Sequence, residues 1–206
     1  MTIGIVNVGI GNTGSLCGAL YSLGWDTRLL ETVEDFEGVD RLILPGVGSF
    51  AESMVRLQRA DLVNSLRRFA ASGKPVLGIC LGMQLLATRG FEGGLNEGLG
   101  LIPGEVRFFD IEKQYRLPHV GWNSLEVSLG HPLLKGIRRG VDFYFVHSYY
   151  FHTENESHII GRTPYGFNFP SIVAKVNVVG TQFHPEKSQR NGLRFLDNFC
   201  SWDGTC

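Results

Sequence analysis

The sequence predicts an α/β fold, with an open, mostly parallel central sheet, antiparallel additions and helices on both faces. Three observations support this fold class. Short apolar segments in the first half alternate with segments of helical periodicity, the rhythm of a parallel sheet covered on both faces. The second half is richer in strand-like segments, which follow one another closely and supply the antiparallel additions. A helical segment then closes the chain.

The first half contains four predicted strands, at residues 3–8, 27–30, 41–44 and 76–79. Glycines follow the first of them, and then Leu16, Leu20 and Leu23 recur at helical spacing. One long helix is predicted over residues 52–71, where apolar residues recur with the same period. Gly73 and Pro75 separate this helix from the strand that follows.

Strands dominate the prediction for the second half. They are expected at residues 105–109, 142–146, 158–160, 171–174 and 177–181, the last extending to Phe183. The closing helix is predicted from about residue 192 to residue 199. No internal repeat, low-complexity tract or long linker interrupts the pattern. We therefore expect a single domain over residues 1–206.

Composition narrows the class of partner. Hydrophobic residues make up 43% of the chain and charged residues 19%, a soluble globular balance. The 19 basic and 20 acidic residues leave a net charge of −1, which argues against a nucleic-acid partner. No run of Lys or Arg suggests an anionic membrane surface. The longest apolar stretch, at residues 75–87, is too short and too rich in glycine to span a bilayer.

The cysteines and the first residues bear on location. The N-terminal segment has no basic residues ahead of its apolar stretch, so it does not resemble a signal peptide. The cysteines show neither a CxxC pair nor the spacing of metal ligands: Cys17, Cys80, Cys200 and Cys206. We expect reduced thiols, no metal, no cofactor and a cytoplasmic protein.

Cys80 is the predicted nucleophile. It lies in Gly78-Ile79-Cys80-Leu81-Gly82, where an apolar strand meets a helical pattern, the thiol counterpart of the G-x-S-x-G elbow. The flanking glycines suit a turn so tight that a Cβ would strike neighbouring backbone. A helix N-terminus also favours a thiolate.

His184 and Glu186 are the predicted partners of this nucleophile. They follow a strand in His184-Pro185-Glu186, and in extended chain residues two apart project to the same side. A base oriented by an acid is what a Cys nucleophile needs. Both motifs fall at the carboxyl ends of strands, where sites gather in open α/β sheets. The three residues predict a thiol amidase.

The predicted oxyanion hole follows another strand. Pro45-Gly46-Val47-Gly48 is a glycine-rich turn directly after residues 41–44, and such a turn can direct a backbone N–H inward. We expect the Val47 amide to be one donor and the Leu81 amide, just after the nucleophile, to be the second.

The motifs together resemble class I (triad) glutamine amidotransferases, a flavodoxin-like α/β family. Three further segments are similar to the glutaminase subunit of imidazole glycerol phosphate synthase: residues 98–104, 118–123 and 144–149. The resemblance runs from Gly4 to Phe199. It implies hydrolysis of L-glutamine and transfer of ammonia to a (β/α)₈-barrel synthase (cyclase) subunit, in a heterodimer that serves histidine biosynthesis.

The resemblance also implies roles for individual residues. Five of them would contact the substrate: Gly48, Gln84, Glu92, Ser148 and Tyr149. Another group would lie at the partner interface near the ammonia passage: Asn12, Trp122, Tyr144 and Lys187. On sequence alone, Glu92 could instead be a solvated loop residue, Trp122 and Tyr144 core aromatics, and Lys187 a free surface lysine.

Three alternatives concern the ammonia acceptor or the class of protein. Asn7-Val8-Gly9 departs from the Asp-Tyr-Gly run common in the family. Residues 91–94 with the loop after them, together with residues 147–152, favour a paralogous set that supplies ammonia for amidino groups on surface sugars. Separately, Gly9-Ile10-Gly11-Asn12-Thr13-Gly14 satisfies the G-x-G-x-x-G pattern of dinucleotide-binding proteins, with Glu31 where a ribose-binding acid would fall. A catalytically silent relative is a third alternative, which the intact triad argues against.

Overall fold

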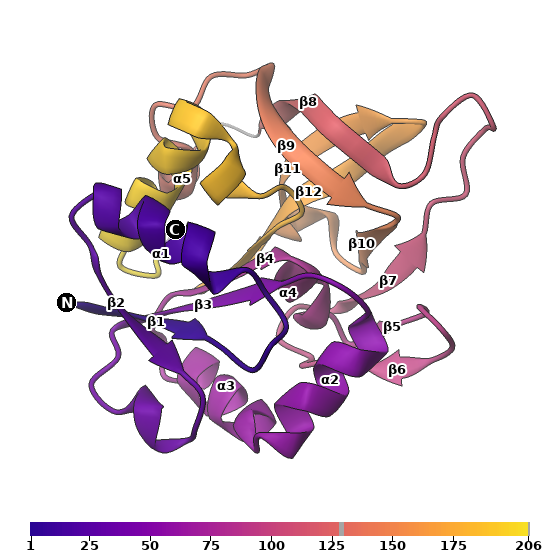
Figure 1. Ribbon diagram of the computed structural model, residues 1–206. Coiled ribbons are helices and arrows are strands. Elements are labelled where there is room, and N and C mark those ends of the chain that lie inside the picture. Colours follow the sequence, from indigo (N-terminus) through magenta and orange to yellow (C-terminus); the bar gives the residue numbers. More distant parts are fainter. Residues whose placement is uncertain (128–129, 206) are drawn as a thin grey trace.

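The computed structural model describes residues 1–127 and 130–205, so Cys206 lies outside the described residues. Its central feature is a nine-stranded sheet in the order β2-β1-β3-β4-β13-β12-β11-β8-β9 (Figure 1). The parallel half consists of β1 (Thr2–Val6), β2 (Asp26–Leu30), β3 (Arg41–Gly46), β4 (Val76–Cys80) and β13 (Val178–Thr181). The antiparallel half adds β8 (His119–Val127), β9 (Val141–His147), β11 (Ile159–Tyr165) and β12 (Phe167–Lys175).

A smaller sheet lies beside the first, in the order β10-β7-β5-β6. Its strands are β5 (Arg89–Gly90), β6 (Asn96–Glu97), β7 (Gly104–Phe108) and β10 (Tyr149–Thr153). The predicted fold class is confirmed, and the antiparallel part is larger than the sequence suggested. The segment at residues 119–127 is a strand that the sequence did not reveal, because its alternation of exposed and buried positions is interrupted by glycine and polar residues.

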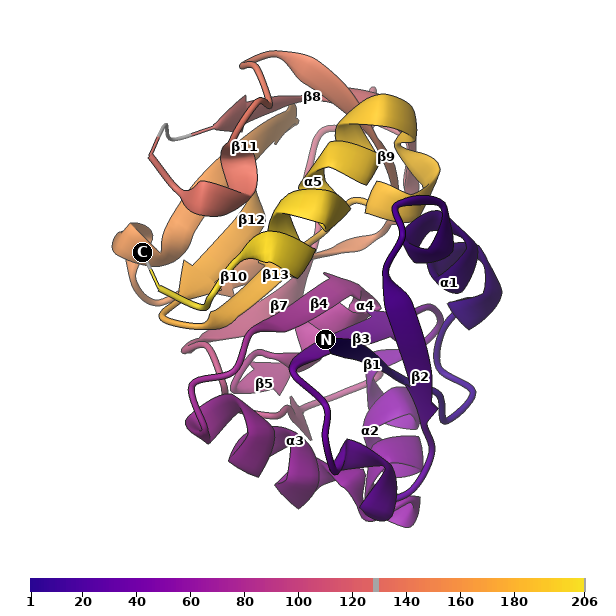
Figure 2. The ribbon, with the colours of Figure 1, turned by 90° about the vertical axis from the view of Figure 1, so that its left-hand side faces the viewer.

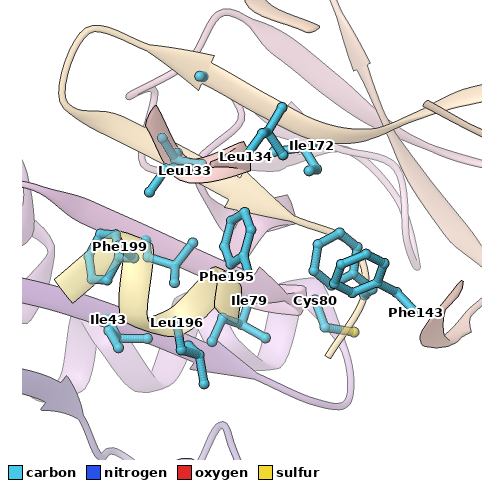
Figure 3. Packing of buried hydrophobic residues seen from close by; sticks show 14 of the residues in the cluster. Ile43, Ile79, Cys80, Leu133, Leu134, Phe143, Ile172, Phe195, Leu196 and Phe199 are labelled. Carbon is cyan, nitrogen blue, oxygen red and sulfur yellow. The ribbon is translucent and has the colours of Figure 1, made fainter. Parts of the chain in front are cut away.

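Helices cover both faces of the parallel half. On one face lie α1 (Thr13–Ser22) and α5 (Gln189–Ser201), and on the other lie α2 (Phe50–Arg59), α3 (Leu62–Ala71) and α4 (Leu81–Leu85) (Figure 2). Alternate residues of β3 show why: Ile43 belongs to the core under α1 and α5, whereas Leu42 and Leu44 belong to the core over α2 and α3. Figure 3 shows Ile43 and Ile79 near Leu196 and Phe199 of α5, which belong to the same core.

The single helix predicted over residues 52–71 is wrong. Two helices occupy this segment, and the chain turns between them at Asp61, whose φ is 57°. Both helices bury an apolar face, with Met54 and Leu57 in α2 and Leu66 and Phe69 in α3. Apolar periodicity continues across the break, so periodicity alone could not locate it.

Short 3₁₀ turns complete the chain, at η1 (Glu34–Phe36), η2 (Pro132–Leu134), η3 (Glu156–His158) and η4 (Pro185–Lys187). Three parallel strands, β3, β4 and β13, lie side by side in the centre of the large sheet. Their carboxyl ends therefore meet at one edge, and the three segments that follow them carry Val47, Cys80 and His184.

Candidate active site

Cys80 stands in a strained turn between β4 and α4. Its φ of 55° and ψ of −110° are a conformation that non-glycine residues rarely adopt. The turn is possible because Gly82 lies against β3: a Cβ there would come within 1.8 Å of the Leu44 carbonyl oxygen. Gly78 is as crowded, since its Cβ would lie 2.6 Å from the Gly82 carbonyl oxygen. The backbone thus fixes where the sulfur points.

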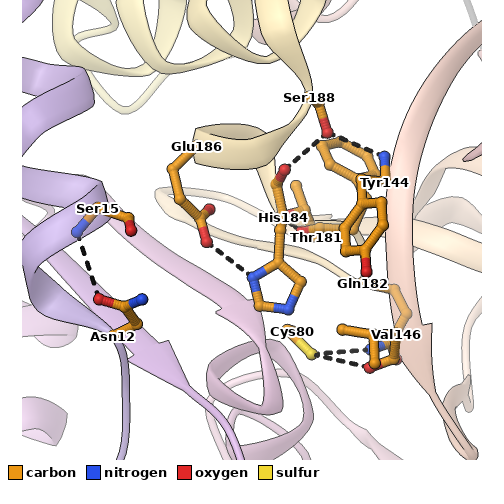
Figure 4. A network of polar contacts seen from close by, with 11 residues as sticks. Asn12, Ser15, Cys80, Tyr144, Val146, Thr181, Gln182, His184, Glu186 and Ser188 are labelled. Atoms are coloured by element: carbon orange, nitrogen blue, oxygen red, sulfur yellow. Dashed lines mark hydrogen bonds and ion pairs between the residues drawn. The ribbon is translucent and has the colours of Figure 1, made fainter. Parts of the chain in front are cut away.

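His184 and Glu186 lie together beside that sulfur. Nδ1 of His184 is 2.8 Å from Oε1 of Glu186, and the opposite edge of the ring faces Cys80 (Figure 4). The expected reason for their closeness was wrong in detail. β13 ends at Thr181, and Glu186 belongs to the 3₁₀ turn η4 rather than to extended chain. Pro185 starts that turn, which folds the carboxylate back toward the imidazole.

The electrostatics make His184 a cation. Burial opposes the charge, but hydrogen bonding and charge attraction from Cys80 and Glu186 outweigh it and raise the pKa of His184 to about 10. Both the imidazole and the Glu186 carboxyl are almost fully buried, with 4% and 5% of their side chains exposed. The imidazole thus lies between a carboxylate and a sulfur, in surroundings that favour its charged form.

His184 lies in a turn, and Ser188 joins this turn to the edge strand β9 by hydrogen bonds. Its hydroxyl donates to the His184 carbonyl oxygen at 2.6 Å and accepts the Tyr144 N–H at 3.0 Å. The His184 N–H in turn donates to the Tyr144 carbonyl oxygen at 2.9 Å. The base is thus positioned by a strand far from it in the sequence, which the sequence did not indicate.

A pocket of about 340 Å³ opens beside Cys80. Its lining contains the predicted nucleophile and base, the predicted substrate contacts and both predicted oxyanion donors: Cys80, His184, Gly48, Gln84, Glu92, Ser148, Tyr149, Val47 and Leu81. Pro118, Val146 and His147 complete it. The structure therefore brings together residues from nearly every segment that the motifs singled out. Its volume is at the lower end of the range for small-molecule sites, roughly 300–1,000 Å³.

The side-chain amide of Gln84 is held by hydrogen bonds to two other residues. Its Nε2 donates to the Tyr149 carbonyl oxygen at 3.0 Å and to Oε1 of Gln182 at 3.1 Å. Both amide hydrogens are then used, so Oε1 is the atom left to meet a ligand. Gln182 is fully buried, and its own Nε2 lies 3.8 Å from the Cys80 sulfur. Gln182 was not predicted as a site residue, although it stands two residues before His184.

Glu92 reaches the pocket from the loop after β5. Its Oε2 accepts the Phe50 N–H, at the first residue of α2, at 2.7 Å. A carboxylate at a helix N-terminus is favourable, and the contact fixes the side chain. The alternative of a merely solvated loop residue is excluded by this contact and by the place of Glu92 in the pocket wall.

Val47 is in place, but its N–H is not directed into the pocket. It donates to the Ile10 carbonyl oxygen at 2.6 Å. The expectation of an inward Val47 amide therefore does not hold for this conformation, because the loop after β1 takes the donor. The same loop packs closely on the turn: a Cβ at Gly11 would lie 2.9 Å from Cβ of Pro45. The Gly9–Gly14 motif thus closes on the Pro45–Gly48 turn, and Glu31 accepts a hydrogen bond from Asn7 at 2.7 Å.

Two of the predicted interface residues, Trp122 and Tyr144, lie on the outer face of β8 and β9, and Lys187 reaches this face from η4. Trp122 is opposite Tyr144 across the two strands, with ring centroids 6.1 Å apart, and Nζ of Lys187 lies 5.8 Å from the Tyr144 ring centre. Trp122 is 47% exposed, so it is not a core aromatic. Asn12 accepts the Ser15 N–H at the start of α1 and lines a small cavity with Lys187 and Glu186.

Two negative observations hold for residues 1–127 and 130–205. No three His, Cys, Asp or Glu side chains in this part of the chain gather as metal ligands would. None of its helices combines the length and the apolar character needed to cross a bilayer. Cys17, Cys80 and Cys200 are free thiols.

The chain resembles known proteins over nearly its whole length. The family model Glutamine amidotransferase class-I matches residues 5–201. Imidazole glycerol phosphate synthase subunit HisH of Desulfitobacterium hafniense is 46% identical over 200 residues, which cover 97% of this chain and 94% of that protein. The HisH subunit of Sulfurimonas denitrificans is 44% identical over 203 residues, 97% of this chain and 98% of that protein. The solved structure of PurLQS from Thermotoga maritima shares the fold, with a TM-score of 0.77 at 18% identity over 97% of each chain.

Proposed function

This chain belongs to the class-I glutamine amidotransferase family, and from that premise we propose that it is the glutaminase subunit of an imidazole glycerol phosphate synthase. The observation that carries the proposal is the buried imidazole of His184, which bonds Glu186 at 2.8 Å and lies with Cys80 in the wall of one pocket. The names of the HisH relatives supply the pathway, histidine biosynthesis. The free thiols support the cytoplasmic location.

The reaction begins with attack of the Cys80 thiolate on the side-chain carboxamide carbon of L-glutamine. A carbon–sulfur bond forms, and the carbonyl electron pair moves onto oxygen. His184 delivers its proton to the amide nitrogen, the carbon–nitrogen bond breaks, and ammonia leaves a γ-glutamyl thioester. His184, now neutral, takes a proton from water, which attacks the thioester and releases glutamate and the thiolate. Glu186 holds the ring in the orientation that both proton transfers need.

The substrate occupies the pocket by contacts from several segments. Glu92 offers a carboxylate to the α-ammonium group of glutamine, and Oε1 of Gln84 offers a second acceptor. Gly48, Ser148 and Tyr149 contribute main-chain groups. The Tyr149 carbonyl oxygen already accepts hydrogen bonds from Gln84 and His147, so we assign the substrate contact to its N–H.

The oxyanion needs two donors, the Leu81 N–H at the start of α4 and the Val47 N–H. The second is bonded to Ile10 in this conformation, so the peptide before Val47 has to rotate for full activity. Half-exposed Val47 and the open surroundings of Gly48 leave room for that rotation. We therefore assign low glutaminase activity to the isolated subunit and high activity to the complex.

The partner is the synthase (cyclase) subunit, and its docking surface is the outer face of β8 and β9. Val120 and Val146 pair on this face beside Trp122 and Tyr144, and Val120 is 56% exposed. An exposed apolar patch with a tryptophan at its centre is typical of a protein interface. Val146 also lines the pocket, so a partner here covers the mouth of the site and can receive ammonia.

Labelling with 6-diazo-5-oxo-L-norleucine, a glutamine analogue that alkylates thiols, tests the chemistry. We expect one adduct on Cys80, found by mass spectrometry, and none on half-buried Cys17 of the same chain. Glutamate release should rise when the synthase subunit is added. Labelling of Cys17 alone, or no adduct in the presence of the synthase, would overturn the glutaminase. Stimulation only by an enzyme of sugar amidination would keep the glutaminase and overturn the histidine pathway.

A further inference from the structure

A buried chain of hydrogen bonds runs from strand β8 to the wall of the pocket. Asn123 Nδ2 lies 3.2 Å from His119 Nε2, and His119 Nδ1 lies 3.0 Å from His147 Nε2. His147 Nδ1 lies 2.8 Å from the Tyr149 carbonyl oxygen. From that oxygen the chain continues through Gln84 and Gln182 to the Cys80 sulfur. None of the roles assigned above uses His119 or His147.

The groups at the two ends of this series of hydrogen bonds determine which atom donates and which accepts at each step. The Tyr149 carbonyl oxygen can only accept, so His147 donates from Nδ1 and accepts at Nε2. His119 must then donate from Nδ1 and accept at Nε2. Asn123 supplies that last donor, because its Oδ1 accepts the Ser124 N–H at 2.8 Å and its Nδ2 also donates to the Pro164 carbonyl oxygen at 2.9 Å. Each ring therefore carries one proton, on Nδ1, and each is neutral.

The surroundings of the rings agree with neutral histidines. His147 and His119 are opposite each other on β9 and β8 and are 6% and 3% exposed. His119 is stacked between Tyr165 and Phe145, at centroid distances of 3.9 and 5.0 Å. Burial lowers the pKa of His119 to about 4 and that of His147 to about 3. A proton added to Nε2 of either ring would point at another hydrogen-bond donor and would interrupt this series of hydrogen bonds.

We propose that His147, supported by His119, is a positioning residue of the active site that holds the Tyr149 carbonyl oxygen and, through it, the Gln84 and Gln182 amides beside Cys80. This proposal rests on the proposed glutaminase function. His147 does not act on the reacting atoms. It gives the Tyr149 carbonyl its second donor, so that the peptide is held from both sides at the point where the chain leaves β9 of the large sheet and enters β10 of the small one.

The position of Tyr149 explains why such a support is needed. At Ser148 the chain passes between two sheets, and neither ladder continues through it. The Phe109 N–H holds the Ser148 carbonyl oxygen, and Gln84 and His147 hold the next one. Without His147, the Tyr149 peptide can turn, and Gln84 loses the acceptor that directs its Oε1 toward substrate. Glutamine binding should suffer more than the chemistry at sulfur.

Two substitutions of His147 separate positioning from simple packing. His147→Asn keeps an amide donor near the place of Nδ1 and can still bond Tyr149, whereas His147→Gln places its amide near Nε2 and cannot. Inactivation by 6-diazo-5-oxo-L-norleucine, measured with the synthase subunit present, gives a concentration for half-maximal rate and a maximal rate. We expect His147→Gln to raise the first by about ten-fold, the size of one net hydrogen bond, with the maximal rate changed less than about three-fold. His147→Asn should stay within about three-fold of the wild type in both.

Two results would overturn the proposal: an unchanged half-maximal concentration in His147→Gln, or an equal rise in His147→Asn. A purely structural role predicts that both variants lose stability and labelled fraction together. The pair His119→Asn and His119→Gln should repeat the pattern with a smaller difference.

A measurement on the wild-type chain covers the case in which variants do not fold. Nitrogen-15 spectra of the imidazoles should show His119 and His147 neutral at pH 6, with the proton on Nδ1. A proton on Nε2, or a charged ring, would overturn the proposal whether or not the chain proves to be a glutaminase. Failure of Cys80 labelling in the wild type would instead count against the proposed function.

Discussion

Two turns follow neighbouring parallel strands and face the same pocket, but they are built in opposite ways. The turn after β4 carries Cys80 and is enclosed by backbone: Gly82 lies against Leu44, and the strained φ of Cys80 has no room to relax. The turn after β3 carries Val47, which is 48% exposed, and its N–H is bonded to Ile10 outside the pocket. The backbone fixes the position of Cys80, the proposed nucleophile, whereas the turn that carries Val47, the proposed oxyanion donor, has room to move. Fixed chemistry and adjustable activity thus reside in adjacent turns.

The largest effect should come from replacing the nucleophile itself. Cys80→Ala and Cys80→Gly should each lower glutamate release by the complex at least ~10⁴-fold, as loss of a nucleophile does in other triads. Their stabilities should differ, because the positive φ at this position favours glycine. We expect the free energy of unfolding of the Gly variant to exceed that of the Ala variant by about 1 kcal/mol in urea denaturation. At most positions alanine is the more stabilising of the two residues. A more stable Ala variant would show that the elbow is not strained.

A methyl group added to each turn compares their packing directly. Gly82→Ala would bring a Cβ within 1.8 Å of a carbonyl oxygen, so we expect more than ~3 kcal/mol of destabilisation or no folded protein. Gly48→Ala meets no atom within 4 Å and suffers only the strain of its φ of 98°, about 1 kcal/mol. Urea denaturation followed by circular dichroism measures both. Equal losses in the two variants would remove the distinction between an enclosed and an open turn.

The charge of His184 depends on the enclosed turn. The imidazole should be protonated at pH 8 and should lose its proton near pH 10, followed by its nitrogen-15 shifts. In Cys80→Ala the hydrogen bond and charge attraction from sulfur are absent while burial stays, so the midpoint should fall. In Arg59→Gln, a surface change on α2, it should not move. A neutral His184 at pH 8 in the wild type would contradict the ion pair on which the mechanism depends.

The smallest effect is expected where the open turn meets the glycine loop. Gly11→Ala would place a Cβ 2.9 Å from Pro45 and push the loop away from the turn, weakening the bond from Val47 to Ile10. The isolated subunit should then hydrolyse glutamine a few-fold faster, since the ~10²-fold contribution of an oxyanion donor would be reached more often. Activity in the complex should change little. Gly14→Ala, where a Cβ has only the Asn12 side chain near it, is the matched control. Lower activity of the isolated Gly11→Ala chain would show that the bond to Ile10 does not control the orientation of the Val47 N–H.

The sequence located the elbow because its chemistry is local. Glycines at fixed distances from Cys80, a strand before it and a helix after it lie within a few residues, and the crowding they imply is present in the structure. His184-Pro185-Glu186 could be recognised for the same reason, although these residues form a 3₁₀ turn and not the extended chain that was expected. The break at Asp61 and the strand at residues 119–127 were not predicted. Apolar periodicity does not record a change in chain direction, and in the strand glycine and polar residues interrupt the apolar pattern.

By itself, the sequence determined the fold class and the family, and it predicted the nucleophile with its base and acid. Each depends on residue types at short spacing, where backbone sterics and side-chain pKa values leave few choices. Only the tertiary structure decided which donors point into the pocket. Val47 bonds with Ile10, Gln84 with Gln182, and His147 with His119, and each pair joins segments that are distant in the chain. A hydrogen bond between distant segments depends on how the sheets pack, so a local sequence pattern cannot predict it.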